Sequence, residues 1–259
     1  MERRFLLTSV LSLIVLASAC GGGPTQPSIP SSAPPVSFTV SAPADLIRIR
    51  ESATFVATGT FPDSTTRPVA AFWTSDMPAV ATVDRQGVVK GVAAGRANIV
   101  ASLNGDTVVK PLRVVPNYAG RWSGPLVIVS CQMGDPRVCG RSYPIGTTGA
   151  LSLNVSQDRD AVAAHLEFTY HVLTNVSTRG GDVTGTILDD GRLILDGKLQ
   201  SRLPDGQLID ALPLWNWSSA ADAGADTVRG SFQELSFSFG GYAQHVGWEF
   251  GPLTRVTSP

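Results

Sequence analysis

The chain carries almost no net charge. Its 259 residues include 20 Lys and Arg against 21 Asp and Glu, which gives a formal net charge of -1 at pH 7. A protein that binds nucleic acid or an anionic lipid surface needs an excess of basic side chains, and this balance does not supply one. Composition therefore argues against nucleic acid as a partner.

Sequence patterns typical of enzymes and metal sites are missing as well. The chain contains no Gly-x-Ser-x-Gly, His-Glu-x-x-His, Walker A or Gly-x-Gly-x-x-Gly pattern. Its only histidines are His165, His171 and His245. The first two share a strand face but should lie roughly 20 Å apart at about 3.3 Å per residue. Asp189 and Asp190 stand at an expected hairpin tip, where solvent or calcium is the expected companion. We therefore expect no catalytic residues, no metal, no cofactor and no enzyme activity.

Long helical patterns are hard to find, and only one long apolar run occurs. It extends from Phe5 to Leu16, follows Arg3 and Arg4, and is succeeded by small residues. This order is typical of a secretory signal peptide, here residues 1–19. The run is too short to span a bilayer, which requires about 20 residues.

Cys20 directly follows the expected cleavage site. A cysteine there resembles the lipobox of bacterial lipoproteins, although Ala17 occupies a position that is most often leucine. The resemblance implies that Cys20 is the acylated first residue of the mature chain, and two or more acyl chains anchor a protein stably. Because Gly21 follows instead of aspartate, it also implies the outer membrane. We expect an exported protein that is anchored to a membrane through Cys20. Whether it faces the cell surface or the periplasm is left open.

Cys131 and Cys139 are the remaining cysteines. An even pair eight positions apart in an exported chain predicts one disulfide. A redox or zinc site would require closer spacing and more ligands.

Two domains are expected after a flexible segment. Residues 20–35 are rich in Gly, Pro and Ser and cannot form a core, so we interpret them as a tether. Residues 36–116 contain short β-rich runs separated by turns, which is typical of a β-sandwich. Within them, Asn104-Gly105 is a strong hairpin signal.

The stretch from Phe72 to Ser102 is similar to the bacterial immunoglobulin-like domains of group 2. The positions that match the family pattern are Trp73, Ser75, Val80, Ala81, Thr82, Val83, Asp84, Gly87, Val89, Gly91, Ala94, Gly95 and Ile99. The resemblance implies a spacer or adhesive module on a cell-surface protein and no catalytic residues. We expect Trp73 to anchor the core, and Gly87 and Gly95 to supply positive φ angles in turns.

Residues 117–259 contain eight runs of strand character. Eight strands joined by hairpins can close into an up-and-down barrel, and an open antiparallel sandwich is the alternative. Gly120-Arg121-Trp122 resembles the Gly-x-Trp of the first strand in lipocalin-like (calycin) barrels. That resemblance implies that a basic residue near the C-terminus, here Arg255, packs over Trp122 and helps to close the barrel.

A ligand site in this second domain is one interpretation of its aromatic residues. Trp215 and Trp217 are two residues apart, so on a regular strand they face the same side. If that side lines the mouth of a barrel, an apolar or carbohydrate ligand could bind there, held by these two residues together with Tyr242, Gln244 and Trp248. The structural alternative is that the same face is simply core.

We therefore expect an all-β, membrane-anchored lipoprotein of the cell envelope whose second domain is a non-catalytic binding or adhesion module, with glycan or protein as its partner. The alternative is a carrier of a small apolar or carbohydrate ligand inside a lipocalin-like cavity.

Overall fold

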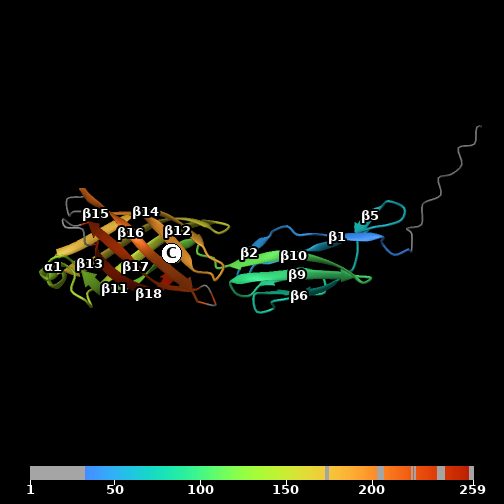
Figure 1. Ribbon diagram of the computed structural model, residues 1–259, viewed down its shortest axis with the longest axis horizontal. Coiled ribbons are helices and arrows are strands. Elements are labelled where there is room, and N and C mark those ends of the chain that lie inside the picture. Colours follow the sequence, from blue (N-terminus) through green and yellow to red (C-terminus); the bar gives the residue numbers. More distant parts are fainter. Residues whose placement is uncertain are drawn as a thin grey trace, which may run out of the picture.

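The computed structural model describes residues 33–172, 175–202, 207–222, 224, 226–237 and 243–256. The predicted signal peptide, Cys20, most of the predicted tether and Tyr242 lie outside these residues. The described residues form two β-domains placed end to end (Figure 1). The predicted all-β class is confirmed.

The first domain is a β-sandwich made of three small sheets. Their strand orders are β1-β4-β5, β2-β10-β9-β6 and β3-β8-β7. The strands are β1 (Ser37–Ser41), β2 (Leu46–Arg48), β3 (Ser52–Thr54), β4 (Val56–Thr60), β5 (Thr66–Pro68), β6 (Phe72–Ser75), β7 (Ala81–Val83), β8 (Val88–Gly91), β9 (Gly95–Leu103) and β10 (Asp106–Val115).

The residues expected to build this sandwich occupy the expected places. Trp73 is buried in the core between the sheets. Gly87 and Gly95 have φ angles of 82° and 148°, which side chains with a Cβ rarely adopt. Asn104 and Gly105 form the tight turn between β9 and β10, both with positive φ.

The second domain is a closed barrel of eight antiparallel strands. Each strand pairs with the next one along the chain, and the last pairs with the first, so the predicted closure is confirmed and the open sandwich was wrong. The strands are β11 (Gly120–Gln132), β12 (Thr148–Asp158), β13 (Ala161–Val172), β14 (Asn175–Ile187), β15 (Leu193–Arg202), β16 (Leu208–Ala221), β17 (Thr227–Phe237) and β18 (Ala243–Arg255).

The two ends of the barrel differ. The β12–β13, β14–β15 and β16–β17 hairpins all lie at the end that faces the first domain. The helix α1 (Pro136–Ser142), between β11 and β12, lies at the opposite end (Figure 1). We call these the proximal end and the distal end.

Candidate functional site

Aromatic rings fill the barrel interior. Trp217 stacks on Phe250 and Phe232, with ring centroids 4.6 and 5.4 Å apart. Trp248 lies 6.0 Å from Phe232 and 5.1 Å from Phe168. All five side chains are buried. Trp217 and Trp248 are therefore core residues, and their packing does not support a ligand cavity lined by them.

The two tryptophans expected to share a face lie on opposite sides of the barrel wall. Trp217 is 1% exposed in the interior, whereas Trp215 is 49% exposed. The register of β16 against β17 shifts between Trp215 and Ser218, which marks a β-bulge. The extra residue, Asn216, has a φ of 51°. The prediction that Trp215 and Trp217 face the same side was wrong, because the bulge interrupts the two-residue period of the strand.

Gln244 lies near the distal end, away from the aromatic interior. Its side chain is partly buried, and its Nε2 lies beside Gly134, in the segment that leads to α1. The expected ligand-binding set is therefore dispersed: Trp215 is outside, Trp217 and Trp248 are in the core, and Gln244 is at the distal end.

Trp122 and Arg255 meet at the proximal end as the resemblance to calycin barrels implied. The guanidinium carbon of Arg255 lies 4.2 Å from the ring centroid of the buried Trp122. Arg255 also donates to the carbonyl oxygens of Asn117 and Ala119, and burial lowers its pKa. Gly120 adopts a φ of 119° next to this guanidinium. These contacts fix the start of β11 to the end of β18.

One charged pair is buried inside the distal half of the barrel. Arg179 and Glu234 are 7% and 2% exposed, and Nη1 of Arg179 lies 2.8 Å from Oε1 of Glu234. Nη2 of Arg179 donates to the Tyr143 hydroxyl at 2.7 Å. Nε1 of Trp248 donates to the second carboxylate oxygen of Glu234 at 3.1 Å. Both charged groups thus have partners, as buried ions require.

Burial and the opposite charge shift the pKa of each residue of this pair in opposite directions. Burial alone would lower the pKa of Arg179, but the facing Glu234 carboxylate raises it overall. Burial raises the pKa of Glu234, against the lowering effect of Arg179. No local sequence pattern indicates this pair, because the two residues are 55 positions apart on different strands.

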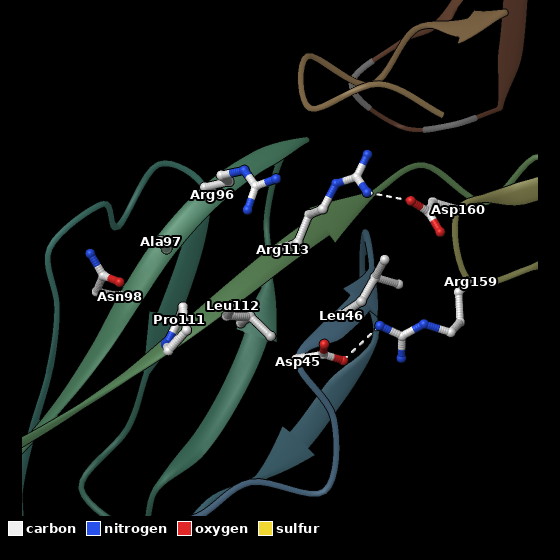
Figure 2. A pocket seen from close by; sticks show the side chains of 10 residues that line it. All are labelled: Asp45, Leu46, Arg96, Ala97, Asn98, Pro111, Leu112, Arg113, Arg159 and Asp160. Carbon is white, nitrogen blue, oxygen red and sulfur yellow. Dashed lines mark hydrogen bonds and ion pairs between the residues drawn. The ribbon is translucent and has the colours of Figure 1, made fainter. Parts of the chain in front are cut away.

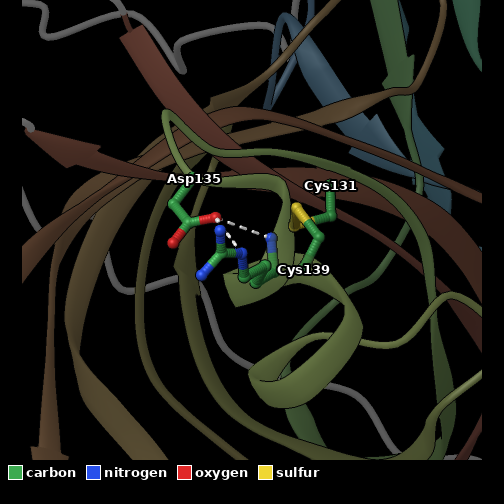
Figure 3. The surroundings of a disulfide bond; sticks show 4 residues. Cys131, Asp135 and Cys139 are labelled. Carbon is green, nitrogen blue, oxygen red and sulfur yellow. Dashed lines mark hydrogen bonds and ion pairs between the residues drawn. A yellow bond between two sulfur atoms is a disulfide. The ribbon is translucent and has the colours of Figure 1, made fainter.

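The distal end is covered by α1 and its flanking residues. Cys131 near the end of β11 is bonded to Cys139 in α1, which confirms the predicted disulfide (Figure 3). Asp135 caps the helix by accepting from the backbone N–H of Arg137 at 2.9 Å. Tyr143, which follows α1, accepts the hydrogen bond from Arg179 in the barrel interior. The disulfide and the Arg179 contact thus attach this cover to the barrel at two points.

His165 and Asp190 have ordinary partners. Nδ1 of His165 lies 2.7 Å from Oδ1 of Asp182 on the exposed face of the barrel. Asp190 pairs with Arg192 at 2.7 Å, and its pKa is lowered by hydrogen bonds from that residue. Within the described part of the chain, no group of three or more His, Cys, Asp or Glu side chains could hold a metal ion.

Asp189 contributes to a charged interface between the domains. Arg113 of β10 lies 2.5 Å from Asp160 and 2.8 Å from Asp189, and also donates to the carbonyl of Ile187. Arg96 lies 2.7 Å from Asp189, and its hydrogen bond lowers the pKa of that carboxyl. The expectation that calcium or solvent alone accompanies Asp189 was wrong, because arginines from the first domain pair with it while its side chain stays 52% exposed.

Two further pairs cross the interface. They join Arg159 to Asp45 at 2.7 Å and Arg50 to Asp226 at 3.2 Å. Figure 2 shows Arg113 and Arg159 reaching across a cleft of about 520 Å³ between the domains. Arg113 pairs with Asp160 and Arg159 with Asp45 there, so we interpret this cleft as part of the interdomain contact.

Comparison with known proteins identifies the first domain. Residues 36–111 match the family model of the bacterial Ig-like domain (group 2), and such domains are typically extracellular or surface-associated. No curated protein matches the chain. None of the described helices is long and apolar enough to cross a membrane. The chain therefore contains a group 2 bacterial Ig-like domain, which is followed by a closed eight-stranded barrel.

Proposed function

We propose that this chain is an exported lipoprotein of the bacterial envelope, anchored through Cys20, in which the Ig-like domain is a spacer that displays the barrel as a non-catalytic binding module. The observation that carries this proposal is the end-to-end order of the two domains. The described chain enters the first domain near β1, at the end far from the barrel (Figure 1). An anchor upstream of β1 would therefore place the spacer between the membrane and the barrel.

The interdomain contact supports display in a defined orientation. Among the described residues, five ion pairs connect the proximal end of the barrel to the Ig-like domain. A single exposed ion pair contributes little, but several that form a network can restrict the rotation of one domain against the other. The distal end and the outer wall of the barrel then remain available to a partner.

A carrier role is less well supported. A carrier requires an enclosed cavity of roughly 300 Å³ or more. The rings of Trp217, Phe232 and Trp248 instead pack against one another in the interior. A binding role on the outside of the barrel agrees better with this packing.

Fractionation of cells that express the protein tests the anchor. Cys20→Ala should move the protein from the membrane pellet to the soluble fraction of lysed cells, because the acyl chains have no other attachment point. The matched control is the double variant Cys131→Ser, Cys139→Ser, which removes cysteines but should leave the protein in the pellet. Continued sedimentation of the Cys20→Ala variant with membranes would refute the lipid anchor.

Protease treatment of intact cells tests the display. A protein anchored on the outer face should be cleaved, whereas a periplasm-facing protein should be cleaved only after the outer membrane is opened. Either result retains the anchor and decides the orientation.

A further inference from the structure

The outer wall of the barrel has a hollow of about 210 Å³ where β11, β16, β17 and β18 lie side by side. We propose that this hollow, with the exposed Trp215 beside it, binds a neutral sugar residue of a glycan. This inference rests on the proposed role of the barrel as a binding module and names its class of ligand.

Gly247 and Ser130 form the floor of the hollow. Gly247 of β18 lies between Gln233 of β17 and Ser130 of β11 in the register of the sheet. A Cβ at Gly247 would collide with Oγ of Ser130. A glycine within a strand often marks a position where another group approaches the backbone closely. The Ser130 hydroxyl therefore occupies the space beside the bare backbone of Gly247, and the two residues form a small, polar floor.

Two β-bulges frame this floor. On β11 the register shifts between Ile128 and Ser130, which leaves Val129 as the extra residue, 40% exposed. On β16 the bulge around Asn216 turns Trp215 and Asn216 together toward solvent. Bulges re-aim side chains and are common next to functional sites. Here they add side chains to both rims of the hollow.

The polar groups around the hollow suit hydroxyl groups. Nδ2 of Asn216 donates to Oε1 of Gln233 at 3.2 Å, so the two amides are already oriented by each other. Each amide retains free donor or acceptor capacity, and the exposed carboxylate of Glu249 accepts hydrogen bonds. Sugar hydroxyls both donate and accept, so this mixture can engage neighbouring hydroxyls of one ring.

Trp215 provides an apolar platform next to these groups. It is the register partner of Gln233 and is 49% exposed. An indole offers a large, rigid apolar face with little conformational entropy to lose on binding. The C–H face of a pyranose ring can stack on such a surface while its hydroxyls reach the amides. An exposed tryptophan beside a polar hollow matches the two-faced character of a sugar.

The charge of the hollow selects among sugars. None of the described side chains that line it is basic, and Glu249 is acidic. A carboxylated or sulfated sugar would meet this carboxylate without a compensating cation. We therefore infer a preference for neutral sugars over acidic ones.

Binding of the purified, detergent-solubilised full chain to immobilised oligosaccharides tests the inference. The probes are oligosaccharides that end in glucose, galactose, mannose or N-acetylglucosamine, and a second set that ends in sialic acid or sulfated galactose. We expect binding to at least one neutral probe, with an affinity of roughly 10 µM to 1 mM because one ring buries little surface. Acidic probes should bind at least tenfold more weakly.

Three variants locate the site. Trp215→Ala should weaken binding at least tenfold, and Asn216→Gly should weaken it severalfold while keeping the positive φ of the bulge. Phe72→Ala removes an exposed aromatic side chain from the Ig-like domain and should leave binding unchanged. The melting temperature of each variant shows that its barrel is folded.

Three results would contradict the proposed sugar site. No binding of the wild-type chain to any neutral probe at 5 mM sugar, roughly the weak limit of useful affinity, would overturn the inference. So would unchanged binding by both barrel variants, or a preference for the acidic set. None of these results would affect the lipid anchor, which the fractionation of the Cys20→Ala variant tests separately.

Discussion

At the scale of single residues, Tyr118 links the interdomain connection to the barrel. Its hydroxyl donates to the carbonyl of Gly191 at 2.8 Å and accepts from the N–H of Ala221 at 3.0 Å. Its own carbonyl accepts from Nε1 of Trp122 at 2.7 Å. Tyr118 is thus bonded to three separate parts of the barrel at its proximal end.

Tyr118 should also make the fold sensitive to alkali. Burial raises its pKa from 10.0 to about 12, and burial raises the pKa of Tyr170 to about 12 as well. The unfolded chain therefore loses these protons at lower pH than the folded one. The stabilisation is complete below pH 10 and is lost as pH rises through 12, at about 2–3 kcal/mol for each tyrosine.

Urea unfolding between pH 8 and pH 12 measures this loss. Tyr118→Phe should be less stable than wild type at pH 8 by about 1–3 kcal/mol, because two backbone groups lose their partner. Its further loss at high pH should be smaller than that of wild type, since only Tyr170 still contributes. An equal alkaline loss in both proteins would contradict the assignment to Tyr118.

Glu234 is the other residue on which the barrel should depend. Glu234→Ala leaves the Arg179 guanidinium buried without its counter-ion, and we expect a loss of about 3–5 kcal/mol in the free energy of unfolding. The double variant Arg179→Met, Glu234→Leu removes both charges and should recover most of that loss. Urea unfolding at pH 7 compares the two, and a double variant as unstable as the single one would argue against a charge effect.

Single residues also show where sequence reasoning succeeds and fails. The packing of Arg255 on Trp122 could be expected because a short motif marks one partner and the chain end supplies the other. The pair of Arg179 with Glu234 could not, because no local pattern relates β14 to β17 across the interior. Only the closed barrel brings these two strands to face each other.

At the scale of elements, the period of two residues predicted the strands well where it was regular. On β13 the buried Leu166, Phe168 and Tyr170 alternate with exposed or half-buried neighbours, as the pattern requires. The period failed at Asn216, where one extra residue placed the two tryptophans on opposite faces of the sheet. Nothing in a single sequence distinguishes a bulge of this kind from a regular strand.

The helix α1 was not anticipated from the sequence, because it is only seven residues long and buries no side chain. Its signals are the Asp135-Pro136 start, with a capping side chain and proline in the first turn. Without an amphipathic face these signals are too short to indicate a helix. Its position depends instead on the disulfide to β11 and on the contact of Tyr143 with Arg179.

Loss of that disulfide should loosen the distal cover. In the chain-entropy account, closing a loop of this length contributes about 2–3 kcal/mol, so Cys131→Ser, Cys139→Ser should lower the free energy of unfolding by that amount. Amide hydrogen exchange should show faster exchange in the segment around α1, while β13 and β17 remain protected. Uniformly faster exchange throughout the barrel would show that the disulfide supports the whole fold and not only its cover.

At the scale of the whole molecule, the relation between the domains depends on residues that the sequence does not connect. Arg113 is 47 positions from Asp160, and its carbonyl partner Ile187 is 74 positions away. Periodicity and motifs describe each domain separately, so they predicted the two folds but not the contact between them. The contact also explains why Asp189 faces arginines and not solvent alone.

Arg113 should hold the two domains in one orientation. Its side chain is 16% exposed and contacts two carboxylates and one carbonyl, whereas the Arg50–Asp226 pair is largely exposed. Hydrogen bonds to charged groups contribute roughly 1.5–3 kcal/mol, and an exposed pair about 0–1 kcal/mol. We therefore expect Arg113→Ala to widen the distribution of interdomain distances in small-angle X-ray scattering, and Arg50→Ala to leave it close to wild type. If both variants scatter like wild type, the ion pairs do not fix the orientation, and the display of the barrel would depend on the packing of the connection around Tyr118.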